Sequence, residues 1–119
     1  AAAGLVQLMG GTAQQACDAA AMSLQCFLGL ICDPVAGLVE VPCVKRNVIG
    51  AVNAVSAADM ALAGIESRVL WQVIDCMGDV GRRLPVELRE TALGGLAATP
   101  FGQSVKAKRE ERRSQEQEL

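Results

Sequence analysis

The chain has 119 residues, of which 51% are hydrophobic and only 3% aromatic, and its formal net charge is −2. This length predicts one domain or a piece of one, and the charge argues against a nucleic-acid binder, which normally carries clustered Lys and Arg. Apolar residues 19–32 are interrupted by Gln25 and fall short of the roughly 18 residues that cross a bilayer. Residues 1–9 lack the basic start and the cleavage site of a signal peptide. We therefore expect a cytoplasmic protein without membrane or nucleic-acid partners.

The first two predicted elements are helices. Residues 1–9 have the composition of the last turns of a helix that began earlier, so we expect the chain to be a fragment. Thr12 and Gln15 have the spacing of a capping box, in which two polar side chains satisfy the free N–H groups of a helix start. Apolar residues at helical spacing follow, and Gly29 is a plausible end. This pattern predicts a helix over 12–29.

A further helix is expected over 45–63, after an irregular loop in which residues 39–41 could form a short strand without a partner. Val48, Val52, Val55 and Leu62 carry one side of this helix, and alanine and glycine make up most of the rest. Small side chains let a neighbouring backbone approach closely, so we expect this helix to be central.

The C-terminal half predicts shorter elements. An apolar stripe predicts a helix over 69–82 with Val69, Val73, Ile74, Met77 and Val80 in the core. Pro85 can open a short helix that runs to residue 90. Residues 91–102 form a glycine-rich loop, and the charged residues 103–119 form a frayed helix or a disordered tail. The predicted fold class is all-α, with a domain over 1–102 followed by the tail.

Histidine is absent, which removes the commonest general base and metal ligand from this chain. The five cysteines include no CxxC pair, and their odd number favours a reducing cytosol over a disulfide framework. Cys17, Cys26 and Cys76 are expected to be buried, because a lone cysteine usually packs as a small hydrophobe.

Cys32 and Cys43 differ from the other cysteines, because they lie eleven positions apart in the irregular stretch LGLICDPVAGLVEVPCVKRN, residues 28–47. Prolines and a glycine keep this backbone out of a helix, so the loop can aim both thiols. The helix start that follows, with Lys45 and Arg46, should stabilise thiolates or other anions. Metal ligation and simple packing both stay open, because two thiols do not complete a site and their spacing is not a standard zinc spacing.

Three stretches together carry a family resemblance. GLICDPVAGLVEVPCVKRN, then GA and AADMALAG, and then LRET with GGLAATP resemble the α chain of bacterial iron–sulfur L-serine dehydratase (L-serine ammonia-lyase), in the form whose α and β chains are separate. The resemblance covers roughly residues 1–102. It implies a [4Fe–4S] cluster with Cys32 and Cys43 as two of its three ligands and with a third ligand upstream of Ala1. Two thiolates should not hold such a cluster, so we expect none on this fragment, which alone should be inactive.

The resemblance also implies a reaction without pyridoxal phosphate. An open iron of the cluster acts as a Lewis acid on the serine hydroxyl, a base removes the Cα proton, and hydrolysis of the resulting imine gives pyruvate and ammonia. This reaction belongs to amino-acid catabolism and gluconeogenesis. The base is expected outside this chain. Arg46 and Asn47 are candidates for holding the substrate carboxylate or the cluster sulfurs, with helix capping and surface pairing as the alternative. Asp33 is favoured as a turn former.

Gly94 and Gly95 are placed near the active site by analogy with single-chain relatives, whose tail cysteine reaches the cluster. This chain has no cysteine after Cys76, so self-capping by a terminal thiolate is not expected. The implied partners are a β chain and L-serine, and an oligomer is possible. Two rival hypotheses remain: a non-catalytic helical interaction module with structural thiols, and a zinc site on the same loop.

Overall fold

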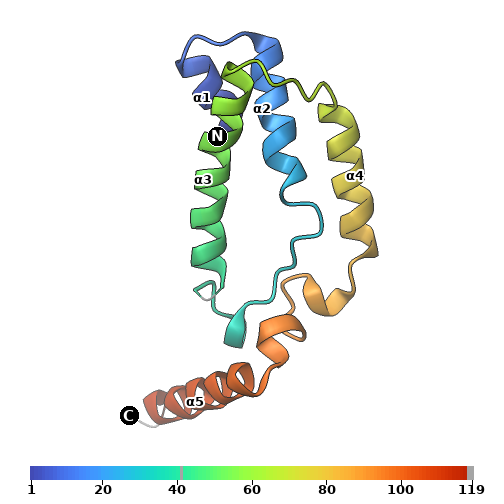
Figure 1. Cartoon of the computed structure of the whole chain (residues 1–119). Coiled ribbons are helices and arrows are strands. Elements are labelled where there is room, and N and C mark those ends of the chain that lie inside the picture. Colours follow the sequence, from blue (N-terminus) through green and yellow to red (C-terminus); the bar gives the residue numbers. More distant parts are fainter. Residues whose placement is uncertain (41, 118–119) are drawn as a thin grey trace. The chain divides into compact units, whose positions relative to one another are not determined.

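The computed structural model describes residues 1–40 and 42–117, and it is built from helices (Figure 1). Within these residues the only β pairing is an isolated bridge between Cys32 and Arg89, so the all-α prediction is confirmed. No described helix has both the length and the apolar character to span a membrane. The α-helices are α1 (Ala2–Leu8), α2 (Ala13–Gln25), α3 (Cys43–Leu62), α4 (Leu70–Arg83) and α5 (Pro100–Gln117). The short 3-10 helices are η1 (Val35–Gly37), η2 (Val86–Leu88) and η3 (Gly95–Ala98).

The chain divides into two compact units. The first contains Ala1–Leu30 and Asn47–Arg83, and the second contains Ile31–Arg46 and the chain from Leu84 onward. The predicted boundary between residues 102 and 103 falls inside α5, and it stays a prediction. Residues 103–117, which we expected to be frayed or disordered, are helical. Val39 and Glu40 form a bend, and Val41 lies outside the described residues, so the possible strand over 39–41 is tested only in part.

The core of the first unit is made almost entirely of alanine. α2 and α3 run in opposite directions in this unit (Figure 1), and alanines of both helices share its core. Close backbone contacts join α2 to α1 and to α4, and the central position of α3 stays a prediction. Of the apolar side that we predicted on α3, Leu62 packs against this core, but Val48, Val52 and Val55 do not, because they are 50%, 65% and 52% exposed. The buried core residues are Ala2, Val6, Ala19, Ala54, Ala57, Ala58 and Ala61.

The predicted capping box at the start of α2 is confirmed. The Gln15 N–H donates to Thr12 Oγ1 at 3.2 Å, and the Thr12 N–H donates to Gln15 Oε1 at 2.9 Å. The helix ends at Gln25, before the turn that leads to Gly29, which has a φ of +75°. The spacing therefore identified the start of this helix more accurately than its end.

Two burial predictions in the first unit are wrong. Cys17, Cys26 and Cys76 are exposed, because the narrow alanine core leaves no room for them. Of the stripe predicted on α4, only Val73 is buried, and Ile74 is 42% exposed. Helical spacing showed which residues share a side, but the small core takes in only part of that side.

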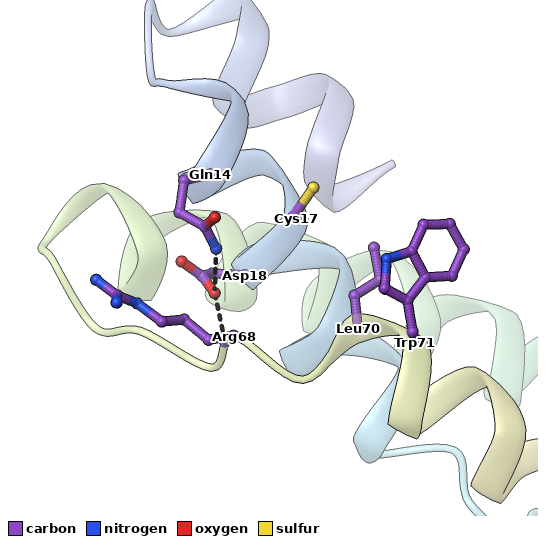
Figure 2. Close-up of a pocket in the computed structure, with 6 residues that line it drawn as sticks. All are labelled: Gln14, Cys17, Asp18, Arg68, Leu70 and Trp71. Carbon is purple, nitrogen blue, oxygen red and sulfur yellow. Dashed lines mark hydrogen bonds between the residues drawn. The ribbon is translucent and has the colours of Figure 1, made fainter.

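Asp18 joins α2 to the segment that precedes α4. Its side chain is buried, and Oδ1 accepts hydrogen bonds from the backbone N–H groups of Ser67 and Arg68, at 3.0 and 2.6 Å, and from Gln14 at 3.2 Å. Figure 2 shows this junction at the edge of a cavity of about 420 Å³ that Cys17, Leu70 and Trp71 also line. The Arg68 N–H, with the other donors, outweighs the effect of burial and lowers the pKa of Asp18. The carboxylate is thus charged and fixes the turn into α4.

Replacing Asp18 with Asn should lower the free energy of unfolding by about 1–2 kcal/mol at pH 7, because a charged acceptor of three donors is lost. A carboxyl whose pKa is lowered on folding stabilises the fold above its ordinary value of 3.8, and this contribution is lost as the pH falls through the folded pKa. The difference between the two proteins should therefore shrink below pH 3.8. Urea unfolding at neutral and acid pH measures it, with the exposed Asp75→Asn as control. A gap that stays constant with pH would contradict the role of the charge.

Candidate functional site

The second unit brings the cysteine stretch against a distant part of the chain. The Cys32 N–H donates to the Leu88 carbonyl at 2.9 Å, and the Glu90 N–H donates to the Cys32 carbonyl at 2.7 Å. These bonds hold the stretch GLICDP beside the stretch LRET, although more than fifty residues separate them. Two of the three stretches that carried the family resemblance therefore meet in one unit.

A buried carboxylate fastens this arrangement. The Asp33 side chain is 1% exposed and forms an ion pair with Arg46 through Oδ1. Arg46 also donates to the Ile31 carbonyl at 3.1 Å, and the Leu96 N–H donates to Asp33 Oδ2 at 2.6 Å. We call the set of Asp33, Arg46 and the Leu96 N–H the carboxylate clasp. It joins the residue after Cys32, a residue three positions after Cys43 and the glycine-rich segment.

The Asp33 carboxyl is charged in this setting. Burial alone would raise its pKa, but the Leu96 N–H and the Arg46 guanidinium stabilise the carboxylate more strongly, so the pKa of Asp33 lies below its ordinary value. The sequence favours Asp33 as a turn former and does not reveal its pair with Arg46. An acidic residue beside one cysteine and a basic residue just after the other were the available signal.

The glycines at 94 and 95 are needed where they stand. Gly95 has a φ of +59°, a backbone conformation that side chains rarely adopt, and a Cβ there would overlap the Asp33 carboxylate. A Cβ on Gly94 would lie 2.9 Å from the Glu87 carbonyl oxygen. The segment that leads into η3 can approach Asp33 and η2 this closely only because it has no side chains at these positions.

Cys32 and Cys43 are both half-buried, within the second unit. Cys43 is the first residue of α3, so our expectation that it lies outside a helix is wrong. Burial, with smaller contributions from Glu90 and Cys43, raises the pKa of the Cys32 thiol, and Arg46 opposes this only in part. The expected stabilisation of a thiolate is therefore wrong for Cys32, because burial disfavours the charged form more than Arg46 favours it. A minor part of the rise in the pKa of Cys32 comes from Cys43, which belongs to the same unit.

The structure places five of the six predicted site residues in the second unit. Asn47 is exposed and belongs to the first unit. Among the described residues, no group of three or more His, Cys, Asp or Glu side chains could hold a metal ion. The cysteine stretch thus offers two thiols as donors. The five residues that share the second unit are Cys32, Cys43, Arg46, Gly94 and Gly95.

Comparison with known proteins shows the family of this chain. The family model of the serine dehydratase alpha chain matches residues 1–97. The chain belongs to this family. It is 59% identical over 109 residues to the probable L-serine dehydratase alpha chain of Bacillus subtilis, a match that covers 91% of this chain. It is 60% identical over 106 residues, or 88% of this chain, to the corresponding protein of Latilactobacillus sakei.

The serine dehydratase relatives are longer than this chain. The matches cover 36% of the Bacillus subtilis protein and 51% of the Latilactobacillus sakei protein. L-serine dehydratase 1 of Escherichia coli is 50% identical over 99 residues, which are 82% of this chain and 22% of that protein. The chain therefore spans about half of these relatives or less. The resemblance found from the cysteine stretch is confirmed at the level of the serine dehydratase alpha-chain family.

Replacing Asp33 with Ala should lower the free energy of unfolding by about 2–3 kcal/mol, because it leaves a half-buried guanidinium and the Leu96 N–H without their charged partner. Urea unfolding gives the loss, and hydrogen exchange should become faster at the Leu96 amide. The matched control is Asp79→Ala, which breaks an ion pair whose two side chains are 59% and 74% exposed and should change stability little. Equal effects of the two substitutions would contradict the clasp.

Replacing Gly95 with Ala should destabilise the chain by at least about 1 kcal/mol, because alanine disfavours a positive φ and its Cβ would collide with Asp33. The matched control is Gly81→Ala within α4, where an added Cβ meets nothing within 4 Å and φ is not positive. That substitution should stabilise the helix by about 0.5–1 kcal/mol. Thermal or urea unfolding measures both, and a stabilising Gly95→Ala would contradict the proposed packing.

Proposed function

We propose that this chain forms part of the active site of an L-serine dehydratase, which converts L-serine to pyruvate and ammonia. In this proposal Cys32 and Cys43 are two of the three thiolate ligands of a [4Fe–4S] cluster. The observation that carries the proposal is the shared setting of the two thiols. They are half-buried in one unit, and the carboxylate clasp ties together the segments that carry them. The names of the relatives support the substrate.

The two thiols that this chain supplies are suitable ligands for such a cluster. Cysteine thiolates are the usual ligands of iron–sulfur clusters, and neither thiol is packed out of reach in a core. The third ligand is expected from a part of the α chain upstream of Ala1, as the family resemblance implies. A bound cluster with one open iron supplies a Lewis acid for the serine hydroxyl. No pyridoxal phosphate enters the proposed reaction.

The residues around the thiols have positioning roles in this proposal. Asp33 fixes the backbone beside Cys32 through Arg46 and the Leu96 N–H. Arg46 donates to both Asp33 and the Ile31 carbonyl, which favours a positioning role over binding of the substrate carboxylate. Gly94 and Gly95 allow the η3 segment to approach this loop. The base that removes the Cα proton is assigned to another part of the enzyme, and a β chain is the proposed partner in the cytoplasm.

Anaerobic reconstitution of the complete α chain with its β chain tests the ligand assignment. Cys32→Ser and Cys43→Ser should each lower iron content, visible absorbance and pyruvate formation by at least about tenfold, because a ligand is lost. Cys17→Ser and Cys76→Ser, which change exposed thiols of the first unit, are the matched controls and should keep all three.

Two results would contradict the proposal. Iron content and pyruvate formation that survive Cys32→Ser would remove Cys32 from the ligand set. A reconstituted enzyme that binds zinc in place of iron and lacks visible absorbance would replace the cluster with a zinc site.

A further inference from the structure

Helix α3 carries apolar residues on two sides. One side is the alanine face in the core of the first unit. On another side lie Val48, Val52 and Val55, whose spacings of four and three residues place them on one surface of the helix. Their exposed fractions are 50%, 65% and 52%. We call these three residues the valine face. A helix at the surface of a complete globular protein normally presents polar residues on the side that faces solvent.

One polar residue of α3 turns away from solvent, while Ser56 and Asp59 of the same helix are exposed. Asn53, which lies between Val52 and Val55 in sequence, is half-buried and turns towards α2. Its amide donates to the carbonyl and to the hydroxyl of Ser23, both at 3.0 Å. Ile49 is also exposed, at 51%. The helix therefore half-buries an asparagine and exposes five large aliphatic side chains, with Val44 at 57% as the fifth. Helices that are apolar on all sides are typical of the interior of larger proteins.

We propose that the valine face is an internal contact surface of the dehydratase, covered by an apolar helical segment of the same α chain that this structure does not contain. The length of the relatives points to this occupant. Their matches to this chain, which are 59% and 60% identical overall, include α3 and leave 64% of one relative and 49% of the other outside (100 − 36 and 100 − 51). The three valines carry no charge, so the complementary surface is aliphatic. The inference rests on family membership and not on the cluster.

Thiol labelling of the complete α chain tests the proposal. Val52→Cys should react with a maleimide at least about tenfold more slowly than the control Asp75→Cys, because burial lets a group react only through local opening. Asp75 is exposed on α4. Site-resolved mass spectrometry separates the new thiol from the native cysteines. The protection is expected without the β chain and at all α-chain concentrations. In the 119-residue chain the two variants should react at similar rates.

Three outcomes would overturn the proposal. Similar rates for both variants in the complete α chain would leave the valine face open to solvent. Protection of Val52→Cys that needs the β chain would make that chain the occupant, and protection that grows with α-chain concentration would make it a second copy. Val48→Cys serves as a second probe if Val52→Cys does not fold. Iron content, which tests the ligand assignment, is read on Cys32→Ser and is independent of these results.

Discussion

The buried charge of Asp33 is the constraint on which the candidate site depends. A carboxylate taken out of water must be matched by charge and by hydrogen bonds, because the cost of leaving it unpaired is several kcal/mol. Arg46 and the Leu96 N–H meet this requirement, and they belong to segments far apart in sequence. Satisfying one carboxylate therefore fixes the thiol loop, the start of α3 and the glycine-rich segment together. The positive φ of Gly95 follows from the same constraint.

The first unit depends on a small apolar core and on hydrogen bonds of polar side chains, not on a buried ion pair. Its core is built from alanine, which buries little area per residue. Hydrogen bonds of polar side chains therefore do much to fix the positions of its helices. Asp18 holds the turn into α4, and Asn53 holds α3 to α2. Larger aliphatic side chains are left outside this small core. A small alanine core supplemented by hydrogen bonds explains why the unit has a well-packed interior and still leaves the valine face exposed.

Much of the fold could be predicted from the sequence, because helix starts, helical spacing and glycine positions act locally. The capping box of Thr12 and the helical state of α2, α3 and α4 were predicted in this way. The family could be predicted from the long, distinctive sequence motif around Cys32 and Cys43. Spacing could not tell which side of α3 faces inward, because both sides are apolar. The pairing of Asp33 with Arg46 and the junction at Asp18 depend on tertiary contacts, and no local signal specifies them.

The role of Arg46 follows from its charge balance. A substrate carboxylate that bound this guanidinium would have to share or displace Asp33, and displacement would leave a buried carboxylate without its ion-pair partner. Separating such a pair costs about 3–5 kcal/mol, which is comparable to the whole binding free energy of a weakly bound small ligand. Substrate binding through Arg46 would thus loosen the loop that presents the thiols. A fixed Arg46 keeps the thiol loop in place, and in the proposed function other groups of the enzyme supply the positive charge for the substrate carboxylate.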